Sequence, residues 1–193
     1  SPPRPARLVY AAAHVVMLPS YADVAHTPDA PGAPADIAEH VDWEATSRFR
    51  DHLDTLGYGV AEAMDTAQRF SLGWDGAREL IRRCGDAQRL NGFVAGASSD
   101  QNPRADDLPA VIDAVVEQVA FIQSCGGIPM ILPMPILALG RAAPDDYVAT
   151  YRAIIDASAG PIFVHWLGPM FHADLEGYFP GDSFRRVMRI DPA

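Results

Sequence analysis

Acidic, hydroxyl and amide side chains gather where one apolar segment of this sequence ends. The run at 59–61 (Gly-Val-Ala) continues into Glu62 and then into Asp65, Thr66 and Gln68. A carboxyl group positioned at a reacting centre acts as a general acid or base, and hydroxyl and amide groups hold substrate oxygens. We expect Asp65 and Glu62 to be acid–base groups, Thr66 to donate its hydroxyl to a substrate carboxylate or a proton relay, and Gln68 to bind substrate.

Glu62 has two interpretations because it lies inside the apolar run. A buried carboxylate costs several kcal/mol unless it is paired or its pKa is raised, and raised pKa values are typical of acid–base groups. The alternative is a structural charge that points outward to an arginine such as Arg82 or Arg83.

Histidine and further polar residues follow the other apolar segments. His165, in the segment FVHWLG, is a candidate to polarise a substrate or donate a proton, with a neutral histidine bonded to a backbone carbonyl as the alternative. The remaining candidates for substrate binding are His14, Ser98, Asp100, Gln101 and Trp166.

We expect no cofactor, with a divalent metal ion as the alternative. The ligands would be His14, Glu62, Asp65 and His165, although no short motif such as H-x-H fixes their geometry. Neither phosphate-binding motif, G-x-x-x-x-G-K-[ST] or G-x-G-x-x-G, follows the first apolar run.

Short apolar runs alternate with helical periodicity, which predicts a parallel sheet covered by helices. The strands are expected at 7–17, 59–65, 92–102, 128–134 and 161–168, and the helices at 41–57, 74–90, 108–126 and 143–160. The segment 18–40 is expected to be a long loop, and 1–193 a single domain. The arginines of RFRDH (48–52) are predicted to lie on a solvated helix face. Such strands form either an open doubly wound sheet or part of a (β/α)8 barrel, and both place ligands at the carboxyl ends of the strands.

Composition narrows the classes of function. The chain has 193 residues and a net charge of -10, which disfavours a nucleic-acid partner. The apolar runs are too short to span a membrane. Cys84 and Cys125 lack C-x-x-C spacing, which favours free thiols in the cytoplasm. All 15 basic side chains are arginine, so no lysine of this chain can form a Schiff base.

VYAAAHVV, GVAEAMDTAQR and HWLGPMF together resemble an uncharacterised dihydrodipicolinate-synthase-like branch of the dihydrodipicolinate synthase / N-acetylneuraminate lyase superfamily. Three longer segments resemble that superfamily as a whole. They are GYGVAEAMDTAQRFSLGWDGARELI (57–81), FVAGASSDQN (93–102) and YVATYRAIIDASAGPIFVHWLG (147–168). Asp65-Thr66-Ala67-Gln68 stands where that superfamily has Thr-Thr-Gly-Glu, and LPMPILALG offers no counterpart to its tyrosine.

The resemblance implies an α/β fold of the aldolase-type (β/α)8 TIM-barrel class, of which this chain would cover about the first five β/α units. It implies a cytoplasmic, homo-oligomeric lyase or aldolase that makes or breaks a C–C or C–N bond of a 2-oxo acid or related carbonyl substrate. The Schiff-base lysine of the superfamily lies on its sixth strand, and we expect it in a C-terminal segment beyond this chain. The alternatives are a metal-dependent barrel lyase or isomerase and a non-catalytic barrel that binds a small metabolite.

Overall fold

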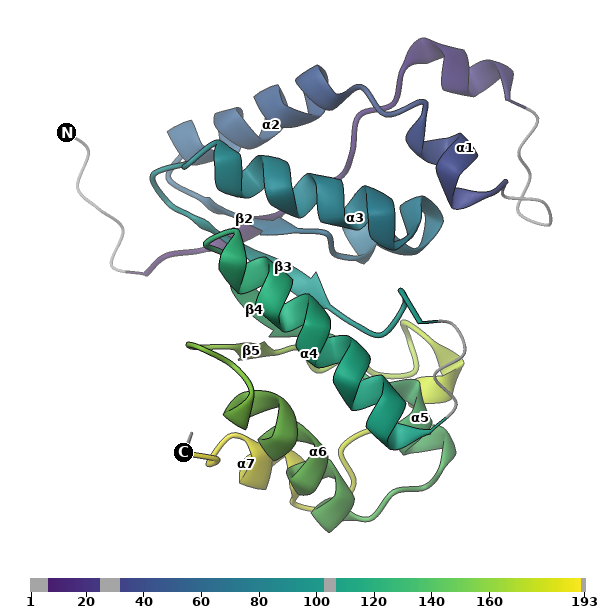
Figure 1. Ribbon diagram of the computed structural model, residues 1–193, viewed down its shortest axis with the longest axis vertical. Helices are drawn as coiled ribbons and strands as arrows, with labels where there is room; N and C mark the ends of the chain where they lie inside the picture. Colours follow the sequence, from purple (N-terminus) through teal and green to yellow (C-terminus); the bar gives the residue numbers. More distant parts are fainter. Residues whose placement is uncertain (1–6, 25–31, 103–106, 192–193) are drawn as a thin grey trace. The chain divides into compact units, whose positions relative to one another are not determined.

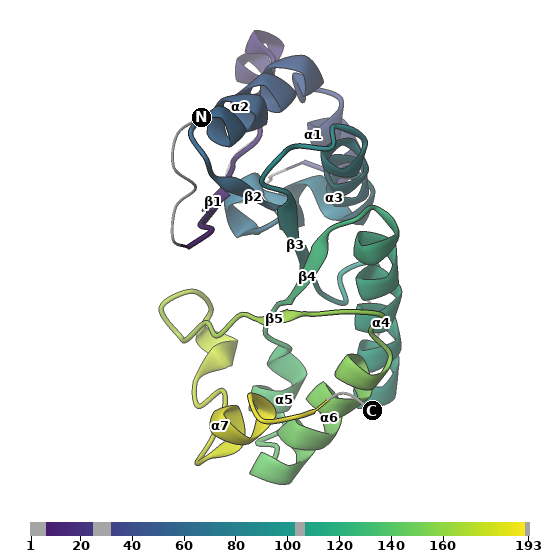
Figure 2. The ribbon, with the colours of Figure 1, turned by 90° about the vertical axis from the view of Figure 1, so that its left-hand side faces the viewer.

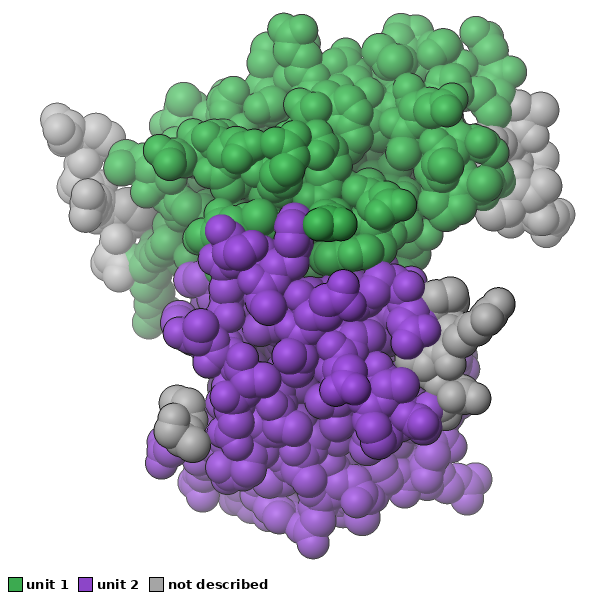
Figure 3. All heavy atoms as spheres, in the orientation of Figure 1, with its two compact units in different colours: residues 1–96, 125–127 green, residues 97–124, 128–193 purple. Residues whose placement is uncertain are grey.

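The computed structural model describes residues 7–24, 32–102 and 107–191. They divide into two compact units, coloured separately in Figure 3: residues 1–96 with 125–127, and residues 97–124 with 128–193. The expected helices and strands are distributed between these two units.

The first unit holds the first strands of a parallel sheet and the helices that connect them. Its elements are β1 (Tyr10–Ala12), η1 (Pro19–Asp23), α1 (Pro34–Ala38), α2 (Trp43–Thr55), β2 (Gly59–Glu62), η2 (Asp65–Ala67), α3 (Arg69–Asp86) and β3 (Phe93–Ala97), whose last residue belongs to the second unit. β2 pairs in parallel with β1 and with β3. Right-handed crossovers between strands in this order put α2 and α3 on the same side of β2, as Figure 1 shows.

The second unit continues the alternation of strands and helices. Its elements are α4 (Leu108–Ser124), β4 (Ile128–Ile131), α5 (Pro135–Leu139), α6 (Pro144–Asp156), β5 (Phe163–Val164), η3 (Ala173–Leu175) and α7 (Ser183–Val187). β4 and β5 pair in parallel, with Ile131 opposite Val164. The short helices α5 and α7 and the longer α6 lie together beyond one side of β5 (Figure 2).

The expected (β/α)8 barrel is wrong for this chain. The sheet has five strands in the order β1-β2-β3-β4-β5, with β1 and β5 at its edges within the described residues. This sequential order also excludes the doubly wound alternative, in which the strand order reverses at a switch point. The fold is α/β with a five-stranded parallel sheet.

Local signals explain where the helices begin and end. The Asp42 side chain accepts a hydrogen bond from the Ala45 backbone at 2.8 Å and caps α2, as its sequence predicts, and Gly57 follows α2 with a φ of 88°. α3 begins earlier than expected, at Arg69, because one helical turn precedes a kink at Gly73, whose φ is 67°.

Two expectations for the start of the chain are wrong. The segment 18–40 is not simply a loop, since it contains η1 and α1. The expected strand 7–17 is shorter, because only Tyr10–Ala12 pairs with β2 while Met17 forms an isolated antiparallel bridge with Val41. Val15, Ile37 and Val41 pack with Leu72 and Leu80 of α3 in a buried cluster. This packing draws the chain after β1 away from the sheet.

None of the helices in the described part of the chain is long and apolar enough to cross a membrane.

Candidate active site

The turn that follows β2 is held in an unfavourable backbone conformation. Ala63 has a φ of 49° and Gln68 a φ of 55°, so two non-glycine residues in the left-handed region bracket Met64–Ala67. Such a conformation costs an L-residue about 1–2 kcal/mol. Backbone strain of this kind persists only where the surroundings impose it, and it concentrates at functional sites.

Two buried charged residues fix Ala63 from both sides. The Ala63 N–H donates to Glu62 Oε1 at 2.9 Å, and Arg69 Nη1 donates to the Ala63 carbonyl at 3.2 Å. The same Arg69 nitrogen donates to the carbonyl of Gly96 at 2.8 Å, near the carboxyl end of β3. Arg69 is fully buried, and its guanidinium lies 5.4 Å from the centre of the Trp74 ring. The turn after β2 is therefore rigidly attached to the sheet.

Arg50 of α2 connects the carboxyl ends of β1 and β2. Its Nε and Nη2 donate to the two carboxylate oxygens of Glu62 at 2.5 and 2.8 Å, a bidentate pair whose side chains are 3% and 0% exposed. Its Nη1 donates to the carbonyls of His14 and Thr46 at 3.0 and 3.1 Å. The position of the chain after β1 and that of the turn after β2 therefore depend on one guanidinium.

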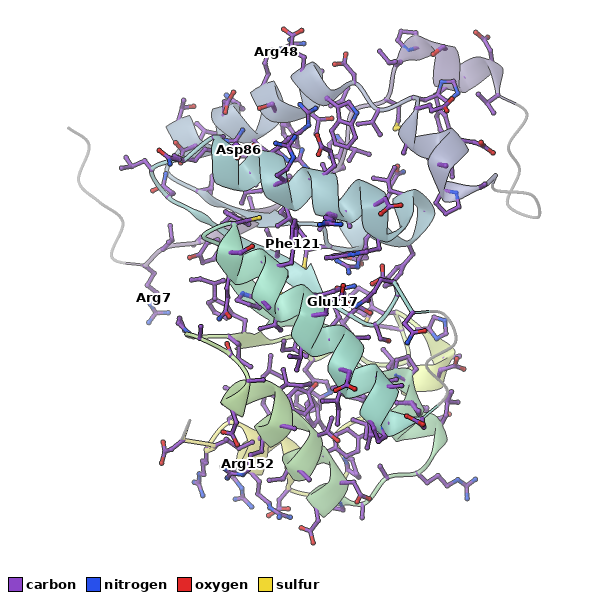
Figure 4. The ribbon with its side chains drawn as sticks, viewed as in Figure 1. Arg7, Arg48, Asp86, Glu117, Phe121 and Arg152 are labelled. Carbon is purple, nitrogen blue, oxygen red and sulfur yellow. The ribbon has the colours of Figure 1, made fainter. Side chains whose placement is uncertain are left out.

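This geometry corrects the expectation for Glu62 as an acid–base group. Both carboxylate oxygens of Glu62 bind Arg50, and this bidentate ion pair holds the carboxylate toward α2. The alternative, a structural charge paired with an arginine, describes Glu62, but the side chain is buried and its partner is Arg50 in place of Arg82 or Arg83. The prediction that the arginines of RFRDH lie on a solvated helix face is therefore wrong for Arg50, which is buried. It holds for Arg48, labelled in Figure 4, which lies on the outer side of α2.

The remaining candidates of the first unit are accessible to a ligand. Asp65 and Gln68 are exposed at the two ends of the turn after β2, and His14 is exposed after β1. The His14 ring packs at 4.9 Å, centre to centre, on Phe49 of α2. Thr66 lies in η2, and the expected role of its side chain falls outside what the structure describes.

The alternative metal site is not formed by the described residues. Among them, no three His, Cys, Asp or Glu side chains are placed to hold a metal ion. Of the four expected ligands, Glu62 binds Arg50 through both oxygens, and His165 belongs to the second unit.

In the second unit, a buried glutamine organises the turn after β3. Gln118 of α4 accepts a hydrogen bond from the Ser98 backbone at 2.8 Å, and its Nε2 donates to Asp100 Oδ1 at 2.9 Å and to Gln101 Oε1 at 2.6 Å. Gln101 in turn donates to the Ala114 carbonyl at 2.6 Å. The expected binding residues Ser98, Asp100 and Gln101 thus lie together, with their polar groups engaged by α4.

His165 and Trp166 follow the carboxyl end of β5, as expected. The His165 N–H extends the sheet by donating to the Ile131 carbonyl at 3.0 Å, and its side chain is half-buried. Trp166 is 54% exposed and packs against Phe184 and Phe179 at ring distances of 4.7 and 5.8 Å. Trp166 is therefore partly accessible to solvent beside His165.

A buried tyrosine pair lies beyond the end of β4. The Tyr178 hydroxyl accepts from the Met134 N–H at 3.0 Å and shares a hydrogen bond with the Tyr151 hydroxyl at 3.1 Å. Burial raises the pKa of Tyr178 to about 12 and that of Tyr151 well above its ordinary value. Both tyrosines are therefore neutral at physiological pH.

Comparison with known proteins gives a family for this chain. A family model described as "Protein of unknown function (DUF993)" matches residues 1–191. The chain belongs to the DUF993 family. None of the curated proteins matches it.

Sequence reasoning missed four residues that shape this DUF993 protein: Arg50, Arg69, Gln118 and Tyr178. The sequence carried no signal for Arg50, because the burial of Thr46, four residues earlier on the same helix face, is known only from the structure. The sequence did carry a signal for Gln118, because it lies at helical spacing between Val115 and Ile122 within the apolar stripe of α4.

Proposed function

We propose that this DUF993 protein is a lyase that makes or breaks a C–C or C–N bond beside the carbonyl group of a small 2-oxo acid or a related compound. We also propose that it acts in the cytoplasm as a homo-oligomer. The resemblance of residues 57–81 to the dihydrodipicolinate synthase / N-acetylneuraminate lyase superfamily supports the choice of substrate.

One observation carries the proposal: the strained turn after β2, fixed on both sides of Ala63, presents Asp65 at the carboxyl end of a parallel strand. Ligands of parallel α/β sheets bind at this end of the strands. A preorganised backbone costs no further ordering when substrate binds, which favours catalysis over a purely structural turn.

The roles follow from the accessibility of each group. Asp65 is the candidate base that removes a proton from the carbon next to the carbonyl, and Gln68 is a candidate donor to the substrate carboxylate. His14 is a candidate to polarise a substrate oxygen, and His165 with Trp166 remains a candidate from the second unit. Glu62 has no proton-transfer role, since Arg50 occupies both of its oxygens.

Proton abstraction can be tested without knowing the complete reaction. The purified protein is incubated in D₂O with a panel of 2-oxo acids, and loss of the C3 proton signal is followed by ¹H NMR. We expect exchange with at least one acid, and we expect Asp65→Asn to slow it by about 10²-fold or more. The matched control is Asp75→Asn, which changes another exposed carboxylate of the same unit.

Two outcomes would contradict the proposal: no exchange with any acid, or equal exchange in Asp65→Asn and the unsubstituted protein. Binding of an acid without exchange would indicate a metabolite-binding protein.

A further inference from the structure

A pocket of about 210 Å³ lies in the first unit at the amino end of β3, whereas the candidate site lies at the carboxyl ends of the strands. Its wall includes Phe93, Gln88, Arg89 and both cysteines of the chain, Cys84 and Cys125. The two thiols come from segments 41 positions apart in sequence and meet at one cavity (125 − 84). Neither forms a disulfide in this structure.

The two cysteine segments are packed directly against each other. Gly85 follows Cys84, and a β-carbon on Gly85 would lie 3.1 Å from the β-carbon of Cys125 and would collide with the Cys125 carbonyl. The absence of a side chain at Gly85 therefore allows Cys125 to approach the end of α3. The backbone that follows Cys84 is therefore in direct contact with the backbone of Cys125, and both thiols line the same pocket.

The two thiols have different surroundings. Cys84 is buried, with Arg89 Nη1 at 3.6 Å from its sulfur. Cys125 is half-buried and open to the pocket. The pKa of Arg82 is raised by its hydrogen bond to Glu79 and, to a smaller extent, by Cys125, so Arg82 lies within electrostatic reach of the Cys125 sulfur. The partial exposure of Cys125 to the pocket admits an oxidant.

We propose that Cys84 and Cys125 are a redox pair that closes to a reversible disulfide in this pocket when the protein meets a hydroperoxide. The Cys125 thiolate attacks the peroxide oxygen, the O–O bond breaks, and Cys125 becomes a sulfenic acid as the peroxide is reduced to water or an alcohol. The Cys84 sulfur then attacks the Cys125 sulfur, the S–O bond breaks, and the thiol proton leaves with the hydroxyl group as water. A dithiol reductant reverses the change.

The second step has a defined pH dependence. Burial, together with the Glu62 carboxylate on β2, raises the pKa of Cys84 to about 12, against opposing effects of Arg89 and of Arg50 on α2. Because the thiolate is the attacking form, closure should accelerate by about tenfold for each pH unit between roughly pH 7 and 10. Capture of peroxide at Cys125 does not depend on Cys84.

The test treats the full chain with hydrogen peroxide and measures its intact mass without reductant. We expect a monomeric species that has lost two hydrogen atoms, a proteolytic fragment that joins Cys84 to Cys125, and recovery of the original mass with dithiothreitol. In Cys84→Ser, a sulfenic acid should persist at Cys125 and react with dimedone. In Cys125→Ser, neither the lighter species nor the dimedone adduct should form.

Circular dichroism establishes whether each variant is folded. If Cys84→Ser does not fold, the proteolytic fragment that joins Cys84 to Cys125 in the unsubstituted chain still tests the proposal. Disulfide-linked dimers without the internal cross-link, or an unchanged mass, would overturn the proposal. So would dimedone labelling of Cys125→Ser. The variant with both cysteines replaced by serine shows how much of the mass change caused by peroxide comes from methionine oxidation.

Discussion

Nε of Arg50 lies 2.5 Å from Oε2 of Glu62, with both side chains buried, and the same guanidinium binds the carbonyl of His14. A helix residue thus fixes the ends of two strands. The turn after β2, which carries Asp65, depends on this pair because Glu62 also accepts the N–H of the strained Ala63.

Breaking the pair should destabilise the protein strongly. Arg50→Met leaves the Glu62 carboxylate buried without its cation, and we expect the free energy of unfolding to fall by about 3–5 kcal/mol, measured by urea denaturation. Arg48→Met is the control, because the Arg48–Glu44 pair is exposed and should contribute less than about 1 kcal/mol. Equal losses of unfolding free energy in the two variants would show that the buried pair stabilises the protein no more than the exposed pair does.

Ala63 should tolerate glycine, unlike an equally buried alanine in a helix. Ala63→Gly relieves the left-handed strain while it loses a buried methyl group, and the two effects nearly cancel, to within about 0.5 kcal/mol. Ala77→Gly, at a fully buried position inside α3, loses the methyl group and helix propensity and should cost about 1–2 kcal/mol. Thermal unfolding of both variants checks the difference, and a larger loss for Ala63→Gly would refute the assigned strain.

Gln118 should control the order of the turn after β3. Gln118→Leu leaves the Ser98 N–H without its acceptor, and we expect a loss of about 1–3 kcal/mol. Faster hydrogen exchange should appear at Ser98. Asp113→Asn, at an exposed position of α4, serves as the control and should change neither quantity. Unaltered exchange at Ser98 in the Gln118 variant would argue against this role.

The tyrosine pair should make stability fall at alkaline pH. Burial raises the pKa of Tyr178 from 10.0 to about 12, so above pH 10 the unfolded chain releases a proton that the folded protein retains. The stabilisation is fully present below pH 10 and is lost as the pH rises toward 12, with a magnitude of about 3 kcal/mol. Tyr151, whose pKa is also raised, adds to the loss with the same sign.

Tyr178→Phe should flatten this alkaline decline, measured as the free energy of unfolding at a series of pH values. Tyr58→Phe, at a position 40% exposed, should leave the decline as it is. A parallel decline in the Tyr178 variant would place its origin elsewhere.

Much of the secondary structure and part of the candidate site were predictable from local patterns. The apolar periodicity of α2 and α4 and the cap at Asp42 depend on neighbours within a few residues, so the sequence alone located these helices. The placement of Asp65, Gln68 and His165 after their strands followed from the same alternation. The one-turn start of α3 and the helix α1 were missed, because they depend on packing between segments distant in sequence.

The sequence by itself determined an α/β chain without lysine, with five strands and polar groups at their carboxyl ends. Only the tertiary structure decided that the strands keep their sequential order in the sheet without closing into the expected barrel. It also decided that Glu62 forms an ion pair with Arg50 while Asp65 is exposed. The physical reason is range: helix periodicity and capping act within one or two turns, whereas the fate of a buried charge depends on which distant residue supplies its partner.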